Sequence, residues 1–240
     1  MRAYGLSDIG KVRESNQDCF AVSVDGAQPV WAVVCDGMGG ANGGYYASNT
    51  AVGAFSHGMD ISFEGLKSKQ IENVMCEAVK NANQSVYKTA LEQPELSGMG
   101  TTLVAAVVLG DSAHIVHVGD SRAYLIGGDK ISRLTTDHSV VQQLVELGQI
   151  TEEEARVHPE KNMITRAVGV KEDVSADASS VKLRKNDAIL LCSDGLSNLL
   201  EEEEMRDIVA TTSHEEAAEL LVSLALSRGG ADNITAVIIK

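Results

Sequence analysis

Proline, cysteine and basic residues are scarce in this sequence, and long apolar runs are missing. With 3 prolines among 240 residues, the chain has no Ser/Pro-rich linker, so we predict a single domain over residues 1–240. The four cysteines, Cys19, Cys35, Cys76 and Cys192, are widely spaced, which argues against a disulfide framework and against a CxxC zinc site. We expect all four to be buried and inert.

The longest apolar run covers residues 103–109, far fewer than the roughly 18 residues that a membrane-spanning helix needs. Residues 1–18 lack an apolar segment followed by a small-residue cleavage site, so no signal peptide is recognisable. We therefore expect a soluble, cytoplasmic protein.

Positive charge is in short supply. The chain has 20 Lys and Arg against 34 Asp and Glu, a formal net charge of −14, which repels polyphosphate backbones and anionic lipids. We expect no nucleic-acid partner and no membrane partner. A phosphate-bearing ligand would need a local arginine or a bound metal to overcome this charge.

Apolar alternation and β-branched residues predict eight strands with a helical block in the first half. The strands are expected at residues 3–7, 19–24, 30–35, 101–109, 113–118, 123–126, 188–192 and 234–239. Helices expected near 45–55 and 71–86 should pack as a hairpin, and glycine turns at 110–111 and 127–128 indicate an antiparallel meander. Because strands and helices come in blocks, we predict an α+β fold, a four-layer αββα sandwich of two antiparallel sheets flanked by helices.

Two later helices carry capping signals, with Thr151 and Ser213 each followed three residues on by glutamate. The acidic run at residues 201–204 is interpreted as the solvated first turn of another helix.

Four aspartates share one local context. Asp36, Asp120, Asp194 and Asp232 each lie at the edge of an apolar run beside glycine or another turn former. Taken singly, each could simply accept hydrogen bonds from turn amides. If they converge, two carboxylates about 5 Å apart repel by about 3 kcal/mol at an effective dielectric constant near 20, and only cations relieve this. Oxygen ligands without histidine or cysteine suit Mg²⁺ or Mn²⁺ and argue against zinc or copper.

The strings around these aspartates recur with others along the whole chain. They are Ser7-Asp8-Ile9-Gly10, Arg13-Glu14-Ser15-Asn16-Gln17-Asp18, Asp36-Gly37-Met38-Gly39-Gly40, Gly100-Thr101-Thr102, Gly119-Asp120-Ser121-Arg122, Asp137-His138-Ser139, Ile164-Thr165-Arg166-Ala167-Val168-Gly169, Ser193-Asp194-Gly195 and Asp232-Asn233-Ile234-Thr235. Each is weak alone, but in this order they form a strong signal. The chain resembles the PPM-type metal-dependent serine/threonine protein phosphatases, the protein phosphatase 2C family, in its bacterial branch.

The resemblance implies two catalytic Mn²⁺ or Mg²⁺ ions and a third ion beside them. Asp36, Asp194 and Asp232 match the ligands of the first ion, and Asp36 with the Gly37 carbonyl matches those of the second. Asp120, with Asp194, matches the position of the third ion.

The same resemblance assigns roles to other residues near the metals. Asp18 corresponds to a carboxylate that supports the metal centre through water, and Arg13 to the guanidinium that binds the substrate phosphate. Animal relatives carry a histidine, the proposed general acid, where this chain has Met38, as bacterial relatives do. Water on the third ion at Asp120, or bulk water, is our hypothesis for the proton donor; His138 and His158 are weaker alternatives.

The function implied is hydrolysis of phosphoserine and phosphothreonine in proteins by a metal-activated water that attacks phosphorus. Phosphorylated proteins, including a serine/threonine kinase, are the expected partners, and we expect a monomer. Residues 146–172 correspond to the family's flap beside the active site. The alternatives are a catalytically weak relative that binds phosphoproteins as a regulator, and a phosphotransferase that uses Asp36 as a covalent nucleophile. All metal carboxylates are retained, which argues against the first, and Gly37-Met38 follows Asp36 where a second aspartate is typical, which argues against the other.

Overall fold

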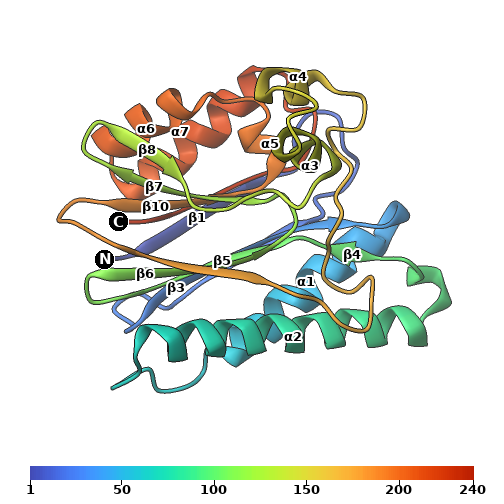
Figure 1. Ribbon diagram of the computed structural model, residues 1–240, viewed down its shortest axis with the longest axis horizontal. Coiled ribbons are helices and arrows are strands. Elements are labelled where there is room, and N and C mark those ends of the chain that lie inside the picture. The colour runs from blue at the N-terminus through green and yellow to red at the C-terminus, as the bar shows by residue number, and fades with distance from the viewer.

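The computed structural model describes residues 1–240, without the side chains of residues 41 and 42. Two antiparallel sheets lie face to face in the middle of the molecule, with helices on both outer faces (Figure 1). One sheet has the strand order β1-β11-β10-β7-β8, and the other β2-β3-β5-β6-β9 with β4 paired to β3. The strands are β1 Ala3–Asp8, β2 Asp18–Val22, β3 Val30–Met38, β4 Gly100–Thr101, β5 Leu103–Leu109, β6 Ser112–Val118, β7 Arg122–Gly127, β8 Lys130–Arg133, β9 Asp177–Lys182, β10 Ala188–Cys192 and β11 Ile234–Ile239.

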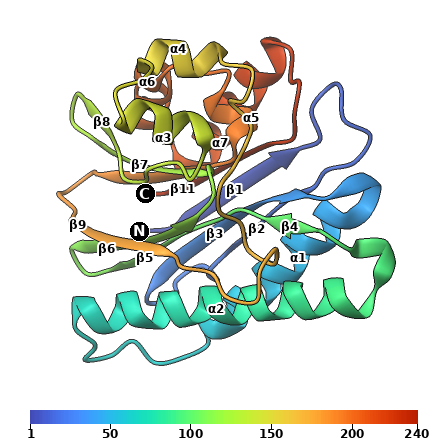
Figure 2. The same cartoon turned by 45° about the vertical axis from the view of Figure 1, so that its right-hand side comes forward.

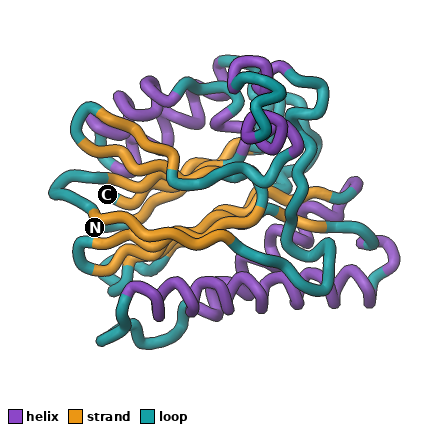
Figure 3. The backbone as a smooth tube through the Cα atoms, viewed as in Figure 1, coloured by secondary structure: helices purple, strands orange, loops and turns teal.

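Helices cover the sheets in two groups. Helices α1 and α2 lie on the outer face of the β3 sheet, and α6 and α7 lie on the outer face of the β10 sheet (Figures 1 and 3). The short helices α3 and α4 sit at one end of the sandwich, as the turned view makes clear (Figure 2). The helices are α1 Gly40–Gly58, α2 Ser68–Glu92, η1 Pro94–Leu96, α3 Val140–Glu146, α4 Glu152–Val157, α5 Asp194–Ser197, α6 Glu202–Thr211 and α7 His214–Ser227.

The period-2 alternation of the central strands builds three apolar layers. In β3, Ala32 and Val34 face the other sheet, while Val33 and Cys35 face α1 and α2. In β10, Leu191 faces the β3 sheet, while Leu190 packs toward α6 and α7. Successive side chains of a strand point to opposite faces, so these central strands must be apolar on both.

Strand direction brings one set of strand ends together. Strands β3 and β6 are both antiparallel to β5, so they run in the same direction and end on the same side. In the other sheet, β10 is antiparallel to β11, so the end of β10 lies beside the start of β11. The termini lie at the opposite end of the sandwich (Figure 1), where Arg2 and Lys240 pair through two backbone hydrogen bonds. Loops and short helices at the other end are therefore free to carry a site.

The structure extends the predicted elements and adds others. The strand predicted over 101–109 is divided into β4 and β5. Strands β8 and β9 were not predicted, because they carry few buried residues. Strand β3 continues to Met38 by exchanging β5 for β4 as its partner, so Asp36 lies within the strand and not beyond its end.

The structure also tests predictions about helix starts and about the cysteines. Thr151 and Glu154 form the expected capping box, and Ser213 accepts from the backbone N–H of Glu216. The run at 201–204 begins α6 as expected. The prediction of four buried cysteines is wrong for Cys19 and Cys76, which are only partly buried and pack against the edge of the core. Among the described helices, none has the length and apolar character needed to cross a bilayer.

Candidate active site

The four singled-out aspartates gather at the end of the sandwich opposite the termini. Asp36 lies near the end of β3, Asp120 in the turn between β6 and β7, Asp194 at the start of α5 directly after β10, and Asp232 just before β11. All four line one cleft of about 640 Å³ and are partly exposed to it. The backbone therefore brings together carboxylates separated by nearly two hundred residues.

The remaining residues of the predicted site lie in or under the same cleft. Arg13 and Gly37 line it. Asp18 is buried and lies directly opposite Asp36 in the β2–β3 pairing. Side chains directly opposite in an antiparallel pair have Cβ atoms about 5 Å apart, so two like charges here destabilise each other.

Burial and neighbouring negative charges both raise the pKa values of these carboxyl groups. Burial raises the pKa of Asp36 well above its ordinary value, and the charges of Asp18 and Asp194 raise it further. Burial, with the charge of Asp194 next, raises the pKa of Asp120 to about 8. Burial and the charge of Asp232 raise the pKa of Asp194, which a hydrogen bond with Asp36 opposes. Without a cation, the cluster holds protons that exposed aspartates would release.

Only one of the two carboxylate oxygens of Asp18 accepts hydrogen bonds from the described side chains. Its Oδ2 accepts hydrogen bonds from Ser193 Oγ and Thr235 Oγ1, each at 2.7 Å, while its buried Oδ1 has no partner among the described residues. Burial raises the pKa of Asp18 to about 7, although both hydroxyl hydrogen bonds lower it. A buried carboxylate oxygen without a partner is costly unless a water or an ion completes it.

These observations test whether the residues fit divalent ions. The donors around the cleft are carboxylate and carbonyl oxygens, which match hard cations such as Mg²⁺ and Mn²⁺. Raised carboxyl pKa values and an unpaired buried oxygen on Asp18 are expected at a site whose negative charge is balanced by bound cations. The residues therefore fit the predicted metals.

Two glycines allow the backbone to approach the cluster closely. A Cβ on Gly37 would collide with the carbonyl oxygen of Gly44 in the first turns of α1, and a Cβ on Gly195 would collide with the carbonyl oxygen of Asn233. Both glycines directly follow a cleft aspartate. They let α1 and the 232–233 turn pack against the strand ends that carry Asp36 and Asp194.

Arg13 reaches the cluster from a loop. Its Nη2 donates to Asp232 Oδ2 at 2.7 Å, and its side chain is 54% exposed. This ion pair partly compensates the negative charge of the cluster and leaves the guanidinium beside the cleft. The guanidinium is the one cationic group among the described cleft-lining residues.

Sequence reasoning assigned no role to Asn233, which holds this loop in place. Its Oδ1 accepts from the Gln17 N–H at 2.8 Å, and its Nδ2 donates to the carbonyls of Ile9 and Ser15 at 2.9 and 3.0 Å. The side chain is buried and uses all three polar contacts on the loop that carries Arg13. The Asp232-Asn233 string was visible in the sequence, but its partners lie more than 200 residues away.

Two threonines that were likewise assigned no role fix Asp36 at the backbone. Thr102 Oγ1 accepts from the Asp36 N–H at 2.9 Å, and both Thr101 Oγ1 and the Thr102 N–H donate to the Asp36 carbonyl at 2.9 Å. Thr102 Oγ1 also bonds Ser121 Oγ at 2.7 Å, next to Asp120. Buried hydroxyl groups thus link the backbone of Asp36 to the turn that carries Asp120.

The histidines named as weaker proton donors do not line the cleft. His138 is buried: its Nδ1 accepts from the Gly119 N–H at 3.0 Å, its Nε2 lies 3.2 Å from Asp177 Oδ2, and its ring stacks on His117. His158 Nδ1 accepts from the backbone of Glu160. These contacts favour structural roles for both, and Met38, which does line the cleft, has no titratable group.

The predicted flap region contributes to the cleft through Asn162 and Ile164. It returns along the molecule toward α2 (Figure 2), and Val168 pairs with Thr101 through two backbone hydrogen bonds. The helix α4 lies near the start of α6, where Arg156 binds Glu201. The segment therefore borders the cleft and is tied to both helical layers.

The fold is that of the PPM-type phosphatases. Serine/threonine phosphatase Stp1 from Staphylococcus aureus superposes with a TM-score of 0.92 at 35% identity, covering 99% of this chain and 94% of that one. The catalytic domain of PstP, solved with two manganese ions, superposes with a TM-score of 0.84 at 33% identity, covering 99% and 96%.

Sequence comparison gives the family. The model of the protein phosphatase 2C family matches residues 10–227, and the protein belongs to this family. Serine/threonine phosphatase stp of Listeria welshimeri is 37% identical over 241 residues, which cover 100% of this chain and 96% of that protein. Protein phosphatase PhpP of Streptococcus pneumoniae is 36% identical over 237 residues, covering 98% and 95%. The predicted family and αββα fold are confirmed.

Proposed function

We propose that this protein hydrolyses phosphoserine and phosphothreonine in proteins with the help of Mn²⁺ or Mg²⁺, acting as a single catalytic domain over residues 1–240. The observation that carries the proposal is the convergence of Asp36, Asp120, Asp194 and Asp232 on one cleft beside Arg13. The names of the relatives support the reaction class.

Three carboxylates and one carbonyl would hold the two catalytic ions: Asp36, Asp194 and Asp232 the first, and Asp36 with the Gly37 carbonyl the second. Asp120, with Asp194, would hold a third. When bound, such ions lower the pKa of a water to make a nucleophile and neutralise charge on the phosphoryl oxygens.

The chain's own residues do the positioning. Asp36 is held by Thr101 and Thr102 through its backbone, so its carboxylate has a defined direction into the cleft. Asp18 is oriented by Ser193 and Thr235, with the free Oδ1 able to accept from an ordered water.

Arg13 would bind the substrate phosphate, because its planar fork can donate to two phosphate oxygens at once. Its Nη2 donates to Asp232, and a cation that neutralises this carboxylate would weaken that bond and free the donor for phosphate. Asn233 fixes the loop that carries Arg13 beside the cleft through its hydrogen bonds to the carbonyls of Ile9 and Ser15.

Phosphorylated proteins are the proposed substrates, a serine/threonine kinase among them, and we propose a cytoplasmic monomer whose flap at residues 146–172 controls access. The departing serine or threonine oxygen must be protonated, and Met38 cannot do this. A water near Asp120 is the proposed donor. An unchanged rate of Asp120→Asn on a substrate with a poor leaving group would remove that role.

The test of the function is hydrolysis of an aryl phosphate and a phosphothreonine peptide with Mn²⁺, with chelator, and in Asp36→Asn and Asp194→Asn variants. We expect activity only in the wild type with metal. Activity that survives chelation would contradict the metal mechanism, and peptide binding without turnover would identify the regulator alternative.

A further inference from the structure

A second pocket, of about 360 Å³, adjoins the active-site cleft. Its lining comes from the start of α1 and from the segment after α2: Gly39, Gly40, Gly43, Tyr46, Gln93, Glu95, Leu96 and Ser97. Gly39 and Gly40 line both this pocket and the cleft. A substrate chain whose phosphorylated residue occupies the cleft can therefore place a neighbouring side chain here.

The pocket has an aromatic wall that faces solvent. The chain contains only 1 Trp, 5 Tyr and 3 Phe, yet two of the tyrosines stand together beside this pocket: Tyr45 is 50% exposed and Tyr46 48% exposed. Their rings meet edge to face, with centroids 5.8 Å apart. Exposed tyrosines offer rigid contact surface to protein ligands and a π face to cations.

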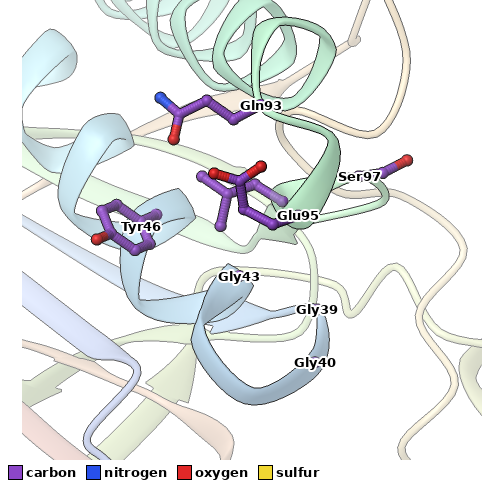
Figure 4. A pocket seen from close by; sticks show the side chains of 8 residues that line it. Gly39, Gly40, Gly43, Tyr46, Gln93, Glu95 and Ser97 are labelled. Carbon is purple, nitrogen blue, oxygen red and sulfur yellow. The ribbon is translucent and has the colours of Figure 1, made fainter.

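The opposite wall is negative. Figure 4 shows the Glu95 side chain over the pocket between Gln93 and Ser97, with Tyr46 across from it and Gly39 and Gly40 below. Glu95 is exposed, and no ion pair joins it to any side chain that the structure describes. Its carboxylate is thus available to a ligand.

Helix polarity strengthens this negative potential. The 25-residue helix α2 ends at Glu92, directly before the pocket, and no basic residue lies in its last turn. Unpaired carbonyls at a helix C-terminus carry a partial negative charge, and Glu92 adds to it. Helix α1 begins at Gly40, on the wall that the pocket shares with the cleft. Its positive end therefore adjoins both, and the negative charge of the pocket lies on the opposite wall, which Glu95 lines.

We propose that this pocket binds an arginine side chain of the substrate segment that flanks the phosphorylated residue. The inference rests on the proposed function. A guanidinium can donate two hydrogen bonds to the Glu95 carboxylate and stack on the Tyr46 ring, a combination that no neutral side chain satisfies. The site therefore selects phosphoproteins with a basic residue near the phosphorylated position.

The test is a positional scan with the Mn²⁺-loaded enzyme. Phosphothreonine peptides carry arginine, or its neutral isostere citrulline, at one position at a time from three residues before to three residues after the phosphothreonine. We expect kcat/KM to be about fivefold higher for arginine at one or two positions, the scale of one exposed ion pair. Added salt should reduce the preference.

Variants assign the preference to the pocket. Glu95→Gln should abolish most of it, and Tyr46→Leu should weaken it. The matched control is Glu64→Gln, which removes an exposed glutamate before the other end of α2, about 37 Å away by helix length, and should leave the preference intact.

Hydrolysis of an aryl phosphate separates the two proposals, because this substrate has no flanking residue. Equal rates for arginine and citrulline at every position, with aryl phosphate still hydrolysed, would overturn the pocket assignment alone. So would a preference that survives both Glu95→Gln and Tyr46→Leu. A wild type inactive on both substrate types would overturn the proposed function, and this inference with it.

Discussion

A buried asparagine on α2 is the strongest structural link between the helical layer and the segment beside the cleft. Asn83 is 1% exposed, and both its amide hydrogens and its amide oxygen bond to the last residues of the flap. Its Oδ1 accepts from the Gly169 N–H at 2.7 Å, and its Nδ2 donates to the carbonyls of Lys171 and Glu172 at 3.0 and 2.8 Å. The neighbouring Val168 pairs with β4, which in turn pairs with the end of β3.

We expect Asn83→Ala to destabilise the protein by about 3 kcal/mol. Each lost hydrogen bond costs about 1 kcal/mol net, and more where a buried group is left without a partner. The Gly169 N–H lies in the buried part of this contact, whereas Lys171 and Glu172 are exposed and their carbonyls can turn to water. For a chain of this length, about 3 kcal/mol corresponds to a Tm lower by about 6–12 °C.

Thermal and urea unfolding followed by circular dichroism measure the effect. Asn81→Ala is the matched control, because Asn81 is an exposed residue of the same helix and both substitutions gain the same helix propensity. A Tm for Asn83→Ala within about 1 °C of the Asn81→Ala value would refute the argument that this amide anchors the segment.

Other predictions follow from the cleft and its surroundings. Mn²⁺ should raise the Tm of the wild type, because it binds only the folded cluster and relieves its repulsion, and should do so much less in Asp36→Asn; a Tm that does not respond to Mn²⁺ would contradict the metal site. Arg13→Ala should lower kcat/KM on phosphopeptides at least tenfold, the loss expected for a charge-assisted hydrogen bond of about 1.5–3 kcal/mol, and a value within twofold of wild type would exclude phosphate binding by Arg13. Burial lowers the pKa of His138, so the unfolded state binds more protons and stability is lost as pH falls from about 6.5 through the folded pKa; His138→Gln should flatten Tm against pH between about 5 and 7, and an unchanged slope would contradict this.

Short stretches of sequence were enough to predict the main strands and the residue types of the metal site. Apolar alternation and β-branched residues predicted the strands that form β3, β5, β10 and β11, and the glycine turns predicted antiparallel pairing. Aspartate–glycine strings, such as Asp36-Gly37, indicated hard-metal ligands before any geometry was known. Such signals are local, because they depend on strand periodicity and on residue type.

Other features depended on contacts that a linear reading does not contain. Strand β9 has five exposed residues among its six and exists because β6 offers an open edge. Asp36 lies inside its strand because β3 exchanges β5 for β4.

The polar residues that orient the site, Asn233 and Thr235, also depend on contacts between distant parts of the chain. Asn233 reaches Ile9 across 224 positions, and Thr235 reaches Asp18 across 217. Residue type and period thus specified which side chains could bind cations and which strands would form. The tertiary structure alone decided which hydroxyl and amide groups orient them, and that an acidic, tyrosine-walled pocket adjoins the cleft, because both arise where distant backbone segments meet.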